Sequence, residues 1–269
     1  TVGSGKKNAG GKLSIVAGSS TDDTIVATGQ GGSIDITAGS GAGATGGAIS
    51  MIGGEGTAST SGAIVIKTRN AGADGISGFL TFSTGTSGKG NTGSISVGTG
   101  KAVKGHGGDI SITVGSGAKN FGGKVTILAG TTTQTGTSGQ GGSIEMSAGS
   151  GKGATGGAVS MFGGSGTLST SGSVTILSRH SGTKGISGAL IFSSGTTTSG
   201  NSGSLLIGTG EAAGGHGGDI SITVGSGAKN VGGKVTVLAG TTTQTGTTGQ
   251  GGSIEMTAGS GKGATGGAV

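Results

Sequence analysis

One five-residue pattern recurs along the whole chain: a glycine, a variable residue, an apolar residue, a second variable residue and a second apolar residue. We call this pattern the apolar phrase. One copy is Gly32-Ser33-Ile34-Asp35-Ile36, and the next begins at Gly47. The remaining copies begin at Gly11, Gly62, Gly78, Gly93, Gly108, Gly123, Gly142, Gly157, Gly172, Gly188, Gly203, Gly218, Gly233, Gly252 and Gly267. Apolar residues two positions apart share one face of a β-strand, and short repeats at a fixed spacing are typical of a solenoid.

A longer repeat contains the short one. Gly32, Gly142 and Gly252 begin successive copies of a 110-residue module, and residues 107–159 and 217–269 differ at only four positions. Each module therefore holds seven apolar phrases. Because seven is odd, a coil made of two phrases would place equivalent residues of successive modules on opposite faces. We therefore expect one phrase per coil.

These periods predict an all-β fold: a thin, two-sheet β-solenoid with one rung of about 15 residues per coil and seven rungs per 110-residue module. The strong strand of each rung would carry the apolar phrase, and the return strand would be small and polar, as in residues 40–45. Residues 1–269 are expected to form a single continuous solenoid and to be a window from a longer chain. The module fragments are 1–31, 32–141, 142–251 and 252–269.

Composition narrows the class of protein. Glycine makes up 73 of 269 residues, and Pro, Cys, Trp and Tyr are absent, so a conventional globular core would be poor. Collagen is excluded because glycine does not occupy every third position. The net charge of +6 is spread without a dense basic cluster, which predicts no nucleic-acid partner. No apolar run is long enough for membrane insertion.

Catalytic and metal-binding patterns are weak. No P-loop is present, and only ten acidic residues occur, too few for a calcium ligand in every turn. The adjacent Asp22 and Asp23 are more simply a solvated loop than an ion site. Asp35, Glu145 and Glu255 share one repeat position, but the predicted rod would hold them about 34 Å apart, too far for a carboxylate pair. We therefore predict no enzyme activity, catalytic residue, cofactor or metal.

A column of apolar residues follows the second apolar position of some phrases. A solvent-facing column would rarely repeat large apolar residues between modules, so we expect a lateral contact with another rod or protein. The alternative is a local pleat shift that turns these residues inward. The column consists of Ile52, Leu128, Phe162, Leu177 and Leu238.

Two irregular repeats occur in each module, and insertions of this kind are favoured places for binding. The 16-residue repeats carry Arg69 and Arg179 where glycine is usual, and the 19-residue repeats add a threonine cluster. The threonines could carry O-linked glycans or contact a partner, or these repeats could simply adjust the twist. The clusters include Thr131, Thr132, Thr133, Thr241, Thr242 and Thr243.

The segment from Gly141 to Gly151, Gly-Gly-Ser-Ile-Glu-Met-Ser-Ala-Gly-Ser-Gly, resembles the Gly/Ser/Thr-rich repeats of large extracellular surface and fibre proteins of algae, diatoms and related protists. It is more loosely similar to bacterial β-solenoid adhesins. The resemblance implies an extracellular or cell-surface location and a structural or adhesive role.

We therefore expect a filament, sheath or surface appendage that forms by rung stacking and by end-to-end or lateral self-association. The alternative is an adhesin stalk that presents a binding domain outside this sequence. A third reading is a surface that binds ice or a surface polysaccharide.

Overall fold

The computed structural model describes residues 10–20, 29–119, 121–134, 139–183, 185–229, 231–262 and 265–269. Within these ranges the chain contains no helix and no strand. The chain divides into two compact units, Thr1–Ile127 and Leu128–Val269, and each is described by itself.

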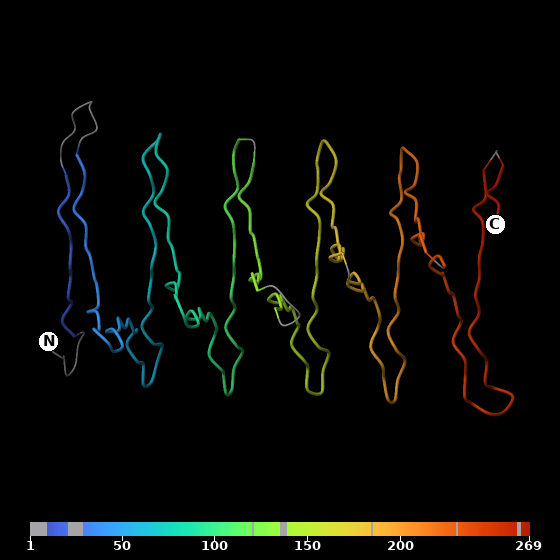
Figure 1. Ribbon diagram of the computed structural model, residues 1–269, viewed down its shortest axis with the longest axis horizontal. Coiled ribbons are helices and arrows are strands. Elements are labelled where there is room, and N and C mark those ends of the chain that lie inside the picture. The colour runs from blue at the N-terminus through green and yellow to red at the C-terminus, as the bar shows by residue number, and fades with distance from the viewer. Residues whose placement is uncertain are drawn as a thin grey trace. The chain divides into compact units, whose positions relative to one another are not determined.

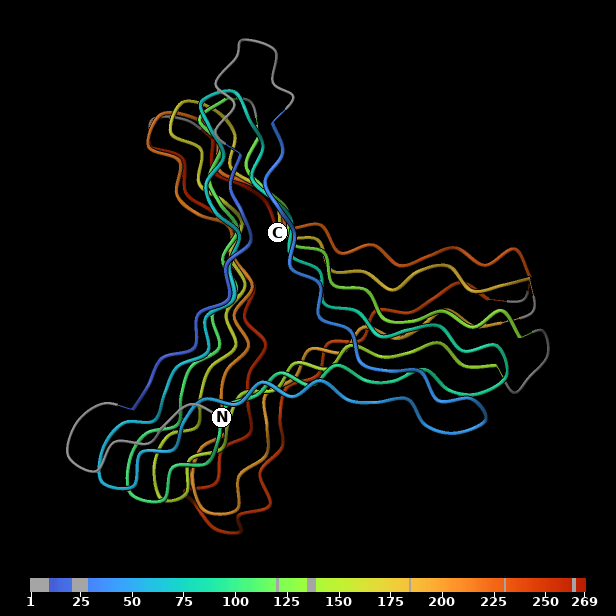
Figure 2. The same cartoon turned by 90° about the vertical axis from the view of Figure 1, so that its left-hand side faces the viewer.

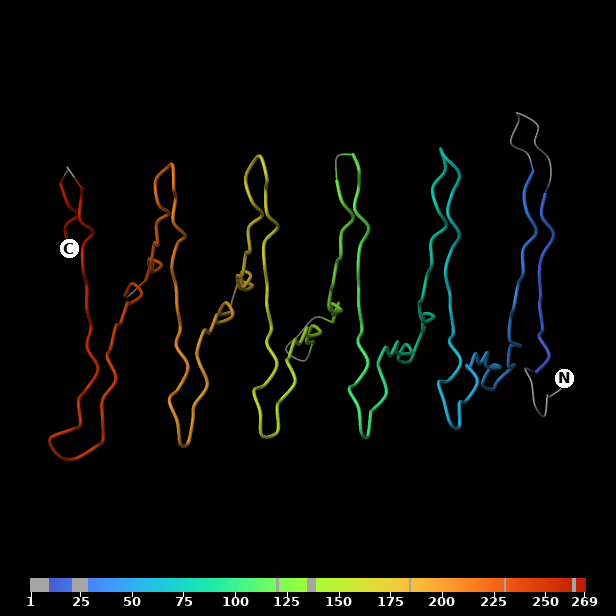
Figure 3. The same cartoon turned by 180° about the vertical axis from the view of Figure 1, so that it is seen from behind.

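Within each unit the short repeat appears as an alternation of extended segments and loops (Figures 1 and 3). The extended segments carry the apolar phrases, and the chain bends in the small, polar stretch between them. In the first unit the bends include residues 42–44, 57–59, 88–90 and 103–105, and in the second unit they include 152–154, 167–169, 198–200 and 213–215. Figure 2 shows the loops of the first unit, coloured blue to green, gathered in three groups with extended segments running between them.

A single backbone hydrogen bond closes many of the loops. The amide of the glycine that opens a phrase donates to the carbonyl of the glycine at the eighth position of the preceding repeat, counted from its own opening glycine, as from Gly47 to Gly39 at 2.8 Å. We call this closure the neck of the loop. Equivalent bonds recur in both units between Gly32 and Gly18, Gly62 and Gly54, Gly123 and Gly115, Gly142 and Gly130, Gly157 and Gly149, Gly172 and Gly164, Gly233 and Gly225, Gly252 and Gly240, and Gly267 and Gly259.

In two other loops a threonine side chain lies beside the glycine that opens the next phrase. A Cβ built on Gly108 would lie 3.3 Å from the Thr99 methyl group, and one on Gly218 would lie at the same distance from the Thr209 methyl group. The hydroxyl of Thr209 also donates to the carbonyl of Gly218 at 3.1 Å. Thr99 and Thr209 are equivalent residues of successive modules, as are Gly108 and Gly218. Loops at the same place in the module therefore have the same local packing.

Three bends in the described ranges place a glycine at positive φ, one of them at Gly246 with φ +119°. Gly43 has φ +75° and Gly153 has φ +82°, and these residues are equivalent positions in successive modules. The left-handed region is strained for residues with a Cβ, so glycine allows the same sharp bend in both loops.

The predicted β-solenoid is wrong for the described residues. Its rungs needed backbone ladders between stacked strands, whereas the structure has isolated necks, each with one hydrogen bond. Alternation of apolar residues specifies a face for a segment but supplies no neighbour to pair with, and Gly-rich flanks specify register weakly. The expected two-sheet layer and the coil of one rung are therefore absent from the part of the chain that the structure describes.

No hydrophobic core is present among the described residues, because none of them is buried. The chain has an accessible surface of 26611 Å². A compact protein of 24.4 kDa would expose about 10,000 Å². The most sheltered side chains are small ones at the necks: Ala17, Ala38, Ala129, Ala239 and Ala258 precede the glycines whose carbonyls accept the neck bonds.

Candidate functional site

The apolar phrases form the most extensive surface feature of the described chain. In most phrases the first apolar residue is about half exposed, as in Ile34 at 51% and Ile144 at 53%, and the second is more exposed, as in Ile36 at 70%. The phrases at Gly62 and Gly172 differ, because their second apolar residues, Ile66 at 47% and Ile176 at 48%, are the less exposed of the two. The two apolar residues of a phrase therefore differ in their exposed fractions, and neither is covered by another part of the described chain. Each unit thus presents regularly spaced apolar side chains to its surroundings.

The five residues expected to make a lateral contact are all exposed. Leu177 is 64% exposed, and the other four, Ile52, Leu128, Phe162 and Leu238, lie between 83% and 89%. No described residue is buried, so the choice between a lateral contact and a pleat shift stays a prediction. What contacts them stays a prediction.

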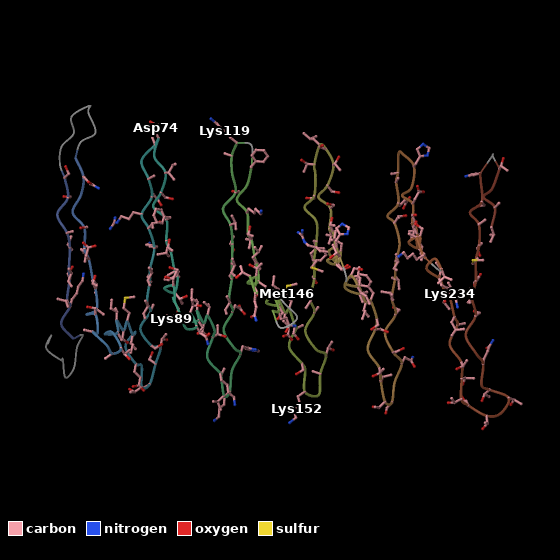
Figure 4. The ribbon with its side chains drawn as sticks, in the orientation of Figure 1. Asp74, Lys89, Lys119, Met146, Lys152 and Lys234 are labelled. Carbon is pink, nitrogen blue, oxygen red and sulfur yellow. The ribbon has the colours of Figure 1, made fainter. Side chains whose placement is uncertain are left out.

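Several loops carry charged side chains, whereas the phrases between them carry apolar ones. Asp74, Lys119 and Lys152 lie at bends of their loops and point away from the trace (Figure 4). Apolar phrases thus alternate along the chain with polar, predominantly basic loops.

Two hollows lie at the arginine-containing repeats. In the first unit Lys67, Thr68, Arg69 and Asn70 line a hollow of about 650 Å³. In the second unit Leu177, Ser178, Arg179 and His180 line one of about 550 Å³. The two arginines occupy equivalent places in successive modules, so the same position of the module forms a hollow in each unit independently.

The turn beyond each arginine is also the same in both units. Gly75 donates to the carbonyl of Gly72, and Gly185 donates to that of Gly182, each at 3.2 Å. A tight turn therefore follows each hollow along the chain. The lengthened repeat thus produces a defined local structure in both units.

The lining of the hollows suits an anion. An arginine guanidinium offers five N–H donors in a planar fork that matches a carboxylate, sulfate or phosphate group. Both hollows lack a carboxylate or thiol in their lining.

The threonine clusters use part of their hydrogen-bonding capacity within their own loops. The amide of Gln134 donates to the hydroxyl of Thr132 at 3.2 Å, and the amide of Gln244 donates to that of Thr242 at the same distance. Thr131, Thr133, Thr241 and Thr243 are exposed beside them. A role for these exposed hydroxyls in glycan attachment or partner contact stays a prediction.

The remaining candidates for chemistry are dispersed. In the described ranges no group of three or more His, Cys, Asp and Glu side chains could hold a metal ion. Asp22 and Asp23 lie outside the described residues. No helix among the described residues is long and apolar enough to cross a membrane.

Sequence reasoning missed the necks and the neighbours of the arginines. It treated the glycines as turn residues, whereas they donate and accept the hydrogen bonds that close the loops. It also did not single out Lys67, Asn70 or His180, although their adjacency to the two arginines was a visible signal.

Comparison with known proteins assigns no family. The chain matches no family model. It matches no curated protein. It matches no solved structure.

Proposed function

We propose that this chain is a structural repeat protein that associates with copies of itself to build an extracellular filament, sheath or surface appendage. The observation that supports this proposal is the regular series of exposed apolar phrases in a chain with no buried side chain among its described residues. The extracellular location rests on the resemblance of the repeats to surface and fibre proteins.

Ordering the chain costs conformational free energy that burial of apolar side chains must offset. Fixing the backbone of one residue costs about 1–2 kcal/mol, and burying one large aliphatic side chain contributes about 1.5–3 kcal/mol. In the isolated chain the apolar phrases contribute little, because even their more sheltered residues, such as Ile34, are 51% exposed. A partner that covered both columns would supply the missing stabilisation.

A second copy of the chain is the partner that fits this surface. The apolar phrases recur at a nearly constant spacing over most of the sequence, and the chain itself presents a surface with that period. A stable interface buries about 1,600 Å² in total, a small part of the 26611 Å² that the chain exposes. Because the same surface repeats along the chain, association can continue beyond a pair into a filament.

The proposal is tested by sedimentation velocity over a range of concentrations. We expect wild-type chains to assemble and the double variant Phe162→Ser/Leu177→Ser to require several-fold higher concentration. The control is Leu168→Ser/Ile186→Ser, which removes similarly large apolar residues that are 100% and 98% exposed but lie outside the apolar phrases and their following column.

Two results would contradict the proposal. Wild-type chains that stay monomeric at every concentration exclude self-association. Equal weakening in both double variants means that general hydrophobicity, rather than the apolar column, drives assembly.

A further inference from the structure

Arginine occurs at only two places in the chain, and both line a hollow. Only two of the 16 lysine and arginine residues are arginines, Arg69 and Arg179. Each stands at the eighth position of its repeat, which is glycine in every other complete repeat. Arg69 lines the hollow of the first unit, and Arg179 lines that of the second. The chain thus uses its planar cation at one position of the module, whereas lysine supplies the positive charge elsewhere.

The choice of arginine favours a ligand whose shape matters. A guanidinium presents its N–H donors in a planar fork that fits two oxygens of a carboxylate, sulfate or phosphate group at once. A lysine ammonium is a compact point charge without this geometry. The two hollows are therefore suited to an oxyanion, beyond a general attraction to negative charge.

Both guanidinium groups are available to such a ligand. Among the described residues, no hydrogen bond or ion pair involves the side chain of Arg69 or Arg179, and both residues are exposed. The one carboxylate in the repeat of Arg69 is Asp74, which does not line the hollow, and the repeat of Arg179 contains none. An oxyanion in either hollow therefore meets no negative charge from the lining.

The residues on either side of each arginine also have matching chemistry. Thr68 and Ser178 precede the arginines, Asn70 and His180 follow them, and all four line the hollows. A hydroxyl, a side-chain amide and a neutral imidazole can each both donate and accept a hydrogen bond. A charged sugar matches this set, because its oxyanion is surrounded by hydroxyls that also donate and accept. An inorganic anion or a peptide carboxylate has no such hydroxyls beside it.

The openness of the hollows favours a polymer over a single charged sugar. Every residue that lines them is exposed, and an ion pair at an open surface is weak because water and salt screen it. A polymer presents the same anion many times, so a group that leaves the hollow is replaced by its neighbour. This advantage acts at each hollow separately.

We propose that each arginine hollow is a binding site for the charged sugars of an acidic polysaccharide. The guanidinium binds a carboxylate or sulfate group of the sugar, and the neighbouring side chains bind its hydroxyls. Nucleic acid fits less well, because no Phe, Tyr or Trp lines either hollow to stack on a base. This binding goes beyond the proposed self-association and does not depend on it, since each hollow lies within one unit of a single chain.

NMR reads the two sites directly in the full, unassembled chain. Because there is no third arginine, the chain has two arginine Nε–H signals, and Arg69→Lys or Arg179→Lys removes and thereby assigns one of them. We expect both signals to shift on titration with trigalacturonate, a sulfated galactose trisaccharide, or both, and to stay in place with the neutral trisaccharide. The more effective acidic trisaccharide identifies the oxyanion as carboxylate or sulfate. Arginine signals that respond to neither would overturn the inference.

A charge-conserving variant separates the shape of arginine from its charge. Arg69→Lys/Arg179→Lys keeps the net charge at +6. We expect it to bind polygalacturonate or dextran sulfate about tenfold more weakly than the wild type, since the forked hydrogen bonds are lost. The amide signals of Gly75 and Gly185, which donate the turn bonds beyond the hollows, check that the local structure is retained. Equal affinity in the variant and the wild type would contradict recognition by the guanidinium.

Matched variants exclude an effect of net charge. Arg69→Gln/Arg179→Gln and Lys89→Gln/Lys152→Gln each lower the net charge from +6 to +4, and Lys89 and Lys152 are exposed residues outside the hollows. We expect the arginine variant to lose most of the polysaccharide affinity and the lysine variant to keep it. Equal losses in the two variants would mean that binding is unspecific attraction of a polyanion.

Two further ligands test the assignment to a sugar. Poly-L-glutamate that binds as tightly as the polysaccharides would identify a protein carboxylate as the ligand instead. Inorganic sulfate that binds as tightly as the sulfated trisaccharide would show that the sugar contributes nothing. Either result contradicts the inference and leaves the proposed function standing, whereas polysaccharide binding by chains that never assemble contradicts the proposed function alone.

Discussion

At the scale of single residues, glycine has two distinct roles at a neck. A Cβ on Gly62 would lie 3.0 Å from the amide nitrogen of Gly54, whereas a Cβ on Gly54 would meet nothing within 4 Å. The glycine that opens a phrase is thus required by close backbone approach. The glycine at the eighth position of the repeat contributes its carbonyl and has room for a side chain.

This difference predicts the effect of two matched substitutions in the dilute monomer. Gly62→Ala should weaken the neck bond, which is 2.8 Å in the structure, and lower the free energy of local opening by about 1 kcal/mol. Gly54→Ala should leave it nearly unchanged. Hydrogen exchange of the residue-62 amide, followed by NMR, measures both, and equal exchange rates in the two variants would show that backbone crowding is not what selects glycine.

At the scale of one loop and its flanking segments, a valine packs into the neck. Val114 and Val224 are the seventh residues of their repeats, counted from the glycine that opens the phrase. Val114 and Val224 are only 40% and 39% exposed, the lowest values among the large hydrophobic residues of the described chain. A Cβ built on Gly123 would overlap the Val114 side chain, and one on Gly233 would overlap Val224. The valine thus fills the space that the glycine leaves empty.

Because the Val114 side chain fills the space beside Gly123, we expect substitutions at these two positions to have non-additive effects on the stability of the neck. Gly123→Ala should open the neck between Gly123 and Gly115 by displacing Val114, at a cost of about 1–3 kcal/mol. Adding Val114→Ala should restore most of the protection of the residue-123 amide, because the two side chains no longer compete for one volume. Gly122→Ala, whose Cβ would meet nothing within 4 Å, is the control. Additive effects in the double variant would refute the packing argument.

At the scale of the whole molecule, the dominant property is apolar surface without a core. Ile112 and Ile222 are both 78% exposed, and no other segment of the described chain covers them. Only a partner from outside the chain could bury them in this conformation. Assembly that buries them should be driven by the hydrophobic effect, which is entropic near 25 °C and weakens on cooling.

Temperature therefore provides a test of the driving force. The concentration at which chains begin to assemble should fall severalfold on warming from about 5 to 35 °C. Light scattering during slow temperature ramps, at fixed ionic strength, measures it. Assembly that dissolves on warming would mean that polar contacts dominate instead.

Prediction from the sequence succeeded where a property depends on residue identity and spacing. The phrase at Gly32 and its equivalents at Gly142 and Gly252 are local patterns, and the departure from them at Arg69 and Arg179 is equally visible in the sequence, whereas a partner role for these arginines stays a prediction. It failed on pairing: Ile34 and Ile36 have the alternation of a strand, but no neighbouring segment forms a ladder with them in the described chain.

The amino-acid sequence by itself determined the two periods, the positions of the apolar phrases and the separation of phrases from polar loops, because these depend only on order along the chain. Only the tertiary structure decided that Gly47 and Gly39 close a neck while the apolar residues around them stay exposed. The physical reason is that alternation creates a face, whereas burial and ladder formation need a second segment at the right distance and register. Glycine, which permits many backbone paths, specifies neither.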